Sequence, residues 1–234
     1  VEASWRGNDI VTLLLAVPLL IGALAQSRKG SKRALLVCLG VLAYSAYNYA
    51  FYLFGAAFNT LFLFYVGVLA FSTLGLIAGL ASTEVRPQVE HIRAERRDRL
   101  TGWLVILVAL ILGAFWITNS AAFIFTGVVP AMVTTTGHPT NVTGALDLWM
   151  VVTFGLLGGT WLVRERAWGF IISAVWTVKG AVYMTALSAA SVSAFLSGTT
   201  RSMAQLALWI PIGAVCLLGA AIILRPSGPS EVMN

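Results

Sequence analysis

Seven long apolar runs make up most of the chain, and short polar segments separate them. A helix that crosses a bilayer needs about 20 consecutive, mostly apolar residues, and each run reaches or approaches that length. The pattern predicts an all-α fold, a polytopic membrane helix bundle of about seven transmembrane helices. The predicted spans are 9–26, 34–55, 58–82, 101–118, 145–163, 168–190 and 204–224.

The second and third runs form the organising unit, a membrane hairpin within Ala43 to Val66 that is rich in aromatic residues. A tight break at Gly55–Asn59 separates its two helices. The first run is short and contains Pro18, which predicts a kink or a tilt. Between the fourth and fifth runs, the link 119–144 starts with an apolar stretch that is too short to span. We expect a re-entrant or interface-lying piece there, packed against the bundle.

The composition supports a membrane protein. Hydrophobic residues make up 59% of the chain and charged residues 10%, whereas soluble domains are about 25% charged. The bilayer must therefore act as the solvent for this chain. We predict a single transmembrane domain over 1–226 and a flexible cytoplasmic tail over 227–234. Both cysteines lie in apolar runs, so neither a disulfide framework nor a zinc site is expected.

The net charge of +6 comes from basic residues that sit in short loops, mainly on one side of the predicted membrane. Twelve of the fifteen Lys and Arg residues fall in 27–33, 83–100, 164–167 and the tail. Because such loops stay in the cytoplasm, we predict an outside N-terminus and a cytoplasmic C-terminus. This distribution of basic residues does not predict a surface that binds nucleic acid. The charged loop 84–99 is expected to be a solvated helix extension that meets anionic membrane lipids, or else a docking site for a partner.

Lys179 is the one clearly ionisable residue in the middle of a predicted span, and a charge is expensive at that depth. Helical spacing places Ser173, Trp176, Gly180 and Tyr183 on the same stripe, which should face the bundle interior. Asp147, at the outer end of the fifth span, is the plausible partner of Lys179. Two other interpretations stay open: a lysine that snorkels or pairs structurally, and Asp147 as a simple helix-start residue.

Aromatic and polar residues also gather in the outer half of the predicted bundle. One interpretation is an aromatic belt with interhelical hydrogen bonds; the other is an outward-facing pocket lined by aromatics with a few polar groups. Under the second interpretation, the candidate ligand-binding residues are Lys179, Asp147, Tyr44, Tyr47, Asn48, Tyr52, Asn59, Tyr65, Trp176 and Tyr183.

The sequence lacks the residues that several common cofactor sites and catalytic motifs require. The only histidines, His91 and His138, fall in predicted loops, which argues against haem or chlorophyll held by axial histidine inside the bundle. No hydrolase, zinc-protease or P-loop motif is present, and no metal site is predicted. The cofactor, if any, is unknown, and an enzyme is not favoured.

Two blocks of the sequence resemble a family of uncharacterised bacterial multi-pass membrane proteins. The first is NYAFYLFGAAFNTLFLFYVGVL, and the second is TGHPTNVTGALDLWMVV followed by RERAWGF. Together they cover about a third of the chain. The resemblance implies a protein of the bacterial inner membrane and no particular activity. It places Asn59, the Thr140–Asn141 pair and Asp147 where the family has the same residue types.

Seven spans, an outside N-terminus and an embedded lysine also resemble retinal proteins. In those proteins the attachment lysine is on the last span, whereas Lys179 is on the predicted sixth and 204–224 has no lysine. Our first functional prediction is therefore a pocket in the outer half for a small or lipidic ligand, serving transport or sensing. The alternatives are an accessory subunit with a membrane-protein partner or a homo-oligomer, a retinal-type protein attached at Lys179, and an intramembrane enzyme.

Overall fold

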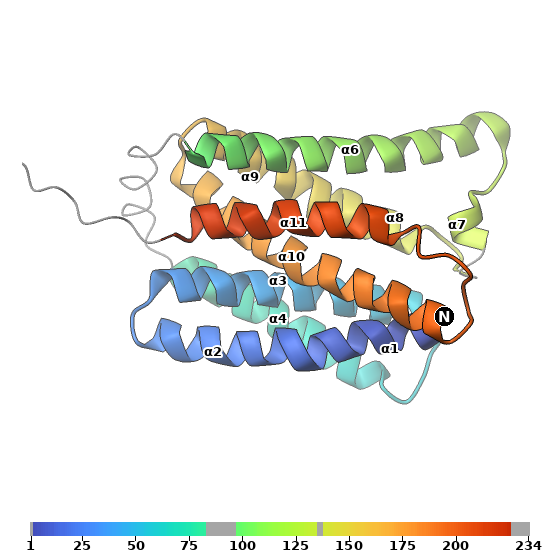
Figure 1. The fold of residues 1–234 in the computed structure, drawn as a ribbon, viewed down its shortest axis with the longest axis horizontal. Helices are drawn as coiled ribbons and strands as arrows, with labels where there is room; N and C mark the ends of the chain where they lie inside the picture. Colours follow the sequence, from blue (N-terminus) through green and yellow to red (C-terminus); the bar gives the residue numbers. More distant parts are fainter. Residues whose placement is uncertain (1, 83–96, 135–137, 226–234) are drawn as a thin grey trace, which may run out of the picture.

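The computed structural model describes residues 2–82, 97–134 and 138–225 (Figure 1). Within these ranges the chain forms helices and no strand. Two short stretches, η1 and η2, are π-helical. The elements in chain order are α1 (Glu2–Val11), η1 (Thr12–Ala16), α2 (Val17–Arg28), α3 (Lys32–Gly55), α4 (Phe62–Ser82), α6 (Arg97–Thr126), α7 (Ala131–Thr134), α8 (Val142–Leu146), η2 (Asp147–Val152), α9 (Thr153–Val163), α10 (Ala167–Leu196) and α11 (Leu206–Ile223).

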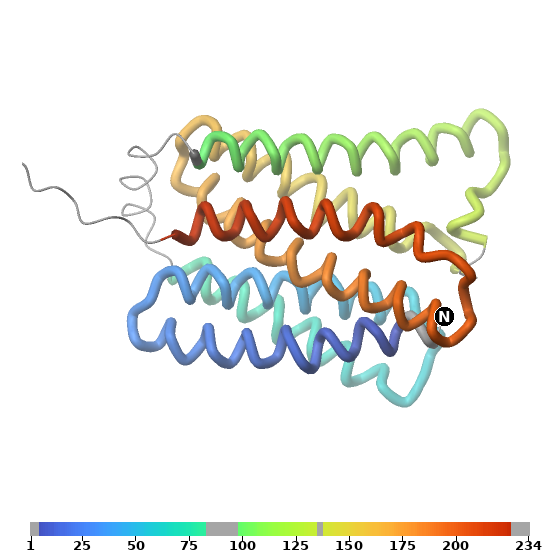
Figure 2. The backbone as a smooth tube through the Cα atoms, in the orientation of Figure 1, coloured from blue at the N-terminus to red at the C-terminus, as the bar shows by residue number. Residues whose placement is uncertain are grey.

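The described helices include seven that are long and apolar enough to cross a membrane, which confirms the predicted number of spans. The chain runs back and forth through the bundle (Figure 2). The spans are Trp5–Arg28, Lys32–Gly55, Phe62–Ser82, Asp98–Thr126, Val142–Val163, Ala167–Leu196 and Leu206–Ile223.

The two ends of the bundle differ in charge. The N-terminal end carries Trp5 and the turns 56–61 and 197–205, and the opposite end carries the turns 29–31 and 164–166 (Figure 1). We call the second the basic end, because Arg and Lys concentrate at its helix termini. Successive spans therefore run in opposite directions between the two ends, as predicted. Which end faces the cytoplasm remains a prediction.

The centre of the bundle is formed by α3 and α10. In the most apolar window of each of these spans, 61% of the residues are buried, against 11% in the first and third spans. Helix α10 crosses the bundle obliquely (Figure 1) and packs against α1, α3, α9 and α11. A side chain on the inner face of α10 is thus surrounded by protein on every side.

The predicted hairpin turn is confirmed at the N-terminal end. Helix α3 ends at Gly55 and α4 begins at Phe62. Between them, the Asn59 side chain donates to the Ala57 carbonyl (2.9 Å) and accepts from the Leu61 N–H (2.8 Å). An Asn that bonds its own loop in this way stabilises a turn. Asn59 therefore shapes the loop and lies exposed.

The predicted boundaries around the fourth span were wrong. The apolar start of 119–144 is no re-entrant piece, because α6 continues as one helix to Thr126. A single turn, α7, follows, and α8 already opens the fifth span. At the other end, the fourth span begins at Asp98, inside the segment that we predicted to be a cytoplasmic loop. Most of that loop, and the tail from 226 on, lie outside the described residues.

Two of the spans contain a π-helical turn. In the first span η1 ends at Ala16, two residues before Pro18. Proline has no N–H and its ring crowds the preceding turn, so the wider turn accommodates the residue for which a kink was predicted. In the fifth span η2 begins at Asp147. Single π-turns within α-helices often occur at functional sites, and Asp147 is one of the residues singled out above.

Candidate functional site

Lys179 lies at the centre of the bundle, as its position in the sequence predicts. It is only 6% exposed. Its Nζ lies 3.8 Å from the centre of the Tyr47 ring and 4.8 Å from that of Tyr183. The two rings meet edge to face, with 4.8 Å between their centroids. An ammonium over aromatic faces gains a cation–π attraction, so the two tyrosines from α3 and α10 hold this charge in place.

Asp147 supplies a negative charge at the hydroxyl end of Tyr47. Its Oδ1 accepts a hydrogen bond from the Tyr47 hydroxyl (2.6 Å) and its Oδ2 one from Trp116 Nε1 (2.9 Å). Hydrogen bonds to a carboxylate are stronger than neutral ones. The charges of Lys179 and Asp147 attract each other, but they form no direct ion pair. Both groups instead contact Tyr47, Lys179 over its ring and Asp147 at its hydroxyl.

In the described part of the chain, the Lys179 ammonium contacts aromatic rings and no hydrogen-bond acceptor. None of the described residues accepts a hydrogen bond from its Nζ or pairs with it as an ion. An ammonium carries three N–H donors, and burying a charge without partners is costly. The cation–π contacts offset only part of that cost. The arrangement is therefore suited to a group that brings acceptor oxygens, such as a carboxylate, a phosphate or a carbonyl.

A second polar cluster ties the N-terminal helix to α3. The Asn8 amide donates to Asn48 Oδ1 (2.7 Å) and to the Tyr52 hydroxyl (2.8 Å). One turn on, the hydroxyls of Thr12 and Tyr44 are hydrogen-bonded at 2.7 Å. Of the predicted residues, Tyr44, Asn48 and Tyr52 thus belong to a helix-to-helix contact. Asn48 Nδ2 is buried without a partner among the described residues.

The remaining predicted residues take three different positions. Trp176 is buried and donates from Nε1 to the Val151 carbonyl (2.9 Å), which links α10 to η2. Tyr65 on α4 packs its ring against Tyr52, with centroids 5.4 Å apart. Asn59 lies in the exposed turn described above. The structure therefore brings Lys179, Asp147, Tyr47 and Tyr183 together, and it leaves Asn59 apart from them.

Several residues of these clusters were missed by the site prediction. Trp116 closes the carboxylate cluster, and Asn8 and Thr12 form the N-terminal contact. Asn8 and Thr12 stand four residues apart, so they share one face of a helix. That spacing was a signal in the sequence. Trp116 stood among the aromatic residues of the outer half, but a tryptophan near the end of a span is also typical of an aromatic belt.

A third set of polar residues is buried toward the basic end. Asp98, at the start of α6, is 0% exposed. Neither of its carboxylate oxygens has a hydrogen-bond partner in the described ranges, and the same holds for the hydroxyls of Thr101 and Ser173. The Arg225 guanidinium lies 3.9 Å from Asp98 Oδ1. We predicted no acidic residue this deep at the basic end.

The fold and these polar clusters define an integral, multi-pass membrane protein with a charged centre. Lys179 lies on the sixth of the seven described spans, and the last span, α11, has no lysine. The chain therefore lacks the last-span lysine to which retinal is attached in retinal proteins. Among the described residues no group of three metal-ligating side chains comes together.

Comparison with known proteins gives no assignment, because no protein family, no curated protein and no solved structure matches the chain. The resemblance to a bacterial membrane family therefore rests on the two quoted sequence blocks alone.

Proposed function

We propose that this membrane protein binds a small or lipidic ligand around Lys179, for transport or for sensing. We further propose, from the distribution of basic residues, that the N-terminal end faces outward and that the site lies in the outer half of the bundle. The resemblance noted above favours the bacterial inner membrane. The ligand carries an acceptor group, and its apolar part lies against the aromatic side chains.

The observation that carries this proposal is the ammonium of the buried residue Lys179, which has no acceptor among the described residues. Asp147 already receives two hydrogen bonds, from Tyr47 and Trp116. The carboxylate is thus engaged and the ammonium is not, although the two are comparably buried. Intramembrane charges that persist in this way commonly mark substrate or ion pathways. A ligand oxygen at Nζ would complete the polar interactions of the bundle centre.

A structural subunit of a larger membrane complex is the second candidate. The observation that favours it is the close packing around Nζ, where the rings of Tyr47 and Tyr183 occupy two sides. Under this alternative, the Lys179–Tyr47–Asp147 arrangement only fastens α3, α10 and η2 to one another. The partner, a second copy or another membrane protein, would then contact the exposed apolar faces.

Native mass spectrometry of the protein purified in mild detergent, with extraction of bound molecules, tests the two candidates. The comparison is wild type against Lys179→Met. Lys29→Met removes the same charge from an exposed loop residue and serves as the control.

We expect a co-purifying molecule in wild type and in the control, and its loss from Lys179→Met. An empty monomer in all three samples contradicts ligand binding. A stable assembly that survives Lys179→Met and holds no small molecule supports the subunit alternative.

A further inference from the structure

The residues around Tyr47 bring together one positive and one negative charge. Helices α9, α10 and α11 contain a single charged residue, Lys179, and η2 contains Asp147. Every other charged residue of the described spans stands in the first or last turns of its span. The charges of Lys179 and Asp147 attract each other. The site is therefore neutral overall before a ligand enters it.

This balance selects the charge of a ligand at Lys179. A carboxylate or a phosphate at Nζ would add a second negative charge near Asp147, and an uncompensated charge is costly inside a membrane. Both oxygens of Asp147 already accept hydrogen bonds, from Tyr47 and Trp116, so the carboxylate is held in place. An uncharged acceptor, such as a carbonyl oxygen, can bind the ammonium and leave the balance unchanged.

A second buried donor lies on the same helix as Tyr47. The next residue, Asn48, is 1% exposed. Its Oδ1 accepts from the Asn8 amide (2.7 Å), but its Nδ2 donates to none of the described residues. One turn before Asn48, the ring of Tyr44 lies 6.4 Å from that of Tyr183, which contacts Lys179. The site therefore offers two separate donors, and a ligand with two acceptor oxygens would satisfy both.

Aromatic rings form much of the remaining surface of the site. Tyr47 and Tyr183 meet edge to face beside Nζ, and Tyr44 adds a third ring. Flat unsaturated rings pack favourably against tyrosine. A quinone combines the required properties, because it is an uncharged flat ring with two carbonyl oxygens, commonly attached to an apolar chain.

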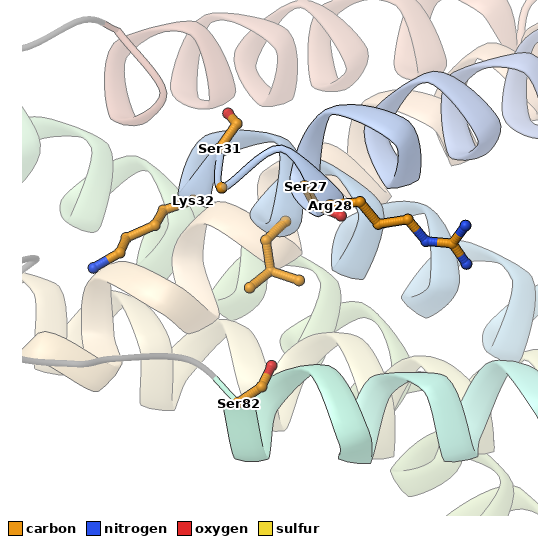
Figure 3. Close-up of a pocket in the computed structure, with 7 residues that line it drawn as sticks. Ser27, Arg28, Ser31, Lys32 and Ser82 are labelled. Carbon is orange, nitrogen blue, oxygen red and sulfur yellow. The ribbon is translucent and has the colours of Figure 1, made fainter.

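A surface hollow at the basic end does not gather polar groups in this way. It has a volume of about 260 Å³ and lies where α2 ends and α3 begins (Figure 3). Its basic side chains, Arg28 and Lys32, point away from each other (Figure 3). The hollow therefore presents no converging charges to a ligand, in contrast to the site at Lys179.

We propose that the ligand at Lys179 is an uncharged, lipid-soluble molecule of the quinone type. One carbonyl oxygen accepts from Lys179 Nζ and the other from Asn48 Nδ2. This inference rests on the proposed function, that Lys179 binds a ligand, and it narrows the ligand class by excluding fatty acids and phospholipids.

The test is native mass spectrometry of the delipidated protein in mild detergent, titrated with probes of similar chain length. The probes are a decyl-substituted benzoquinone, methyl decanoate and decanoate. The ester and the acid share a carbonyl and a chain and differ in charge. Wild type is compared with Lys179→Met, and Lys29→Met is the control at an exposed residue.

We expect wild type and Lys29→Met to bind the quinone about tenfold more tightly than decanoate, and to prefer methyl decanoate to decanoate. Lys179→Met should weaken quinone binding by about tenfold, because it removes a hydrogen bond from a charged donor. Quinone binding that is absent, or equal in wild type and Lys179→Met, overturns the inference.

A different result separates this inference from the proposed function. If decanoate binds more tightly than methyl decanoate and Lys179→Met abolishes its binding, the ligand is an anion. The quinone assignment is then wrong and the ligand site at Lys179 stands. The proposed function itself fails if the protein from native membranes is an empty monomer.

Asn48→Leu tests the second oxygen, since it removes the Nδ2 donor. Asn8→Leu is the matched control, because it removes the same bond between Asn8 and Asn48 but keeps the Asn48 amide. We expect Asn48→Leu to lower the quinone affinity about fivefold and to leave methyl decanoate binding unchanged. Equal losses in the two variants would show that Asn48 acts only through the helix contact, and the two-oxygen assignment would be wrong.

Discussion

The buried polar residues at the two ends of the bundle behave differently. Toward the N-terminal end they form hydrogen bonds between helices, as Asn8 does with Asn48 and Tyr47 with Asp147. Toward the basic end, Asp98, Thr101 and Ser173 are equally buried, yet none has a side-chain hydrogen-bond partner in the described chain. Burial of a polar residue within a membrane bundle therefore does not by itself show that the residue fastens helices.

Side-chain length explains much of this difference. In the N-terminal half, tyrosine, asparagine and tryptophan reach across the gap between helices. At the basic end the hydroxyls are short, and Gly219 separates Thr101 from Thr177: a methyl group added at Gly219 would lie 3.2 Å and 3.0 Å from their Cγ2 atoms. These threonines thus meet the neighbouring helix through their methyl groups.

Asp147→Asn should cost about 3–5 kcal/mol of stability, because it leaves the buried Lys179 charge uncompensated and places an amide group where two donors converge. Unfolding in a detergent series, followed by circular dichroism, measures the effect. Asp9→Asn is the control, since Asp9 also accepts from a tyrosine but is exposed. A loss below about 1 kcal/mol for Asp147→Asn would show that the carboxylate does not balance Lys179.

Tyr47→Phe keeps the ring beneath Lys179 and removes only the hydroxyl that bonds Asp147. We expect a loss of about 1.5–3 kcal/mol, the range for a hydrogen bond to a charged group. The matched control is Tyr49→Phe, whose hydroxyl bonds none of the described residues. Equal effects of the two substitutions in the same unfolding assay would mean that the Tyr47–Asp147 bond contributes nothing.

Thr12→Val should cost about 1 kcal/mol, because it removes the hydrogen bond to Tyr44 and keeps the side-chain shape. Thr73→Val is the control: the Thr73 hydroxyl bonds only its own helix, at the Leu69 carbonyl. Amide hydrogen exchange reports the local effect. We expect faster exchange in the first span alone. Unchanged exchange there, relative to the control, would show that this contact does not hold the N-terminal helix.

Asp98→Asn should change stability by less than about 1 kcal/mol, because none of the described residues donates a hydrogen bond to its carboxylate and the Arg225 guanidinium is 3.9 Å away. The contrast with the same substitution at Asp147 is the direct comparison of the two ends. The unfolding assay described for Asp147 measures both. A loss at Asp98 as large as that at Asp147 would mean that water or the Arg225 charge satisfies the Asp98 carboxylate.

The sequence predicted the number of spans from the length of the apolar runs, and the central position of Lys179 from helical spacing. It failed at helix ends. Asp98 was predicted in a loop because it follows a charged run, but its burial depends on neighbours distant in the sequence. The position of Tyr47 in contact with both Lys179 and Asp147 was also out of reach. That position depends on the rotation of α3 relative to α10 and η2, which no local pattern encodes.

The central claim is that Lys179 presents its ammonium to a ligand, and the density around its Nζ tests this most directly. A high-resolution cryo-EM or crystal structure of the protein, purified with its native lipids, is the measurement to make. We expect non-protein density with an acceptor atom about 2.8 Å from Nζ, beside the rings of Tyr47 and Tyr183. Density for water alone, or a direct Lys179–Asp147 ion pair, would contradict the account.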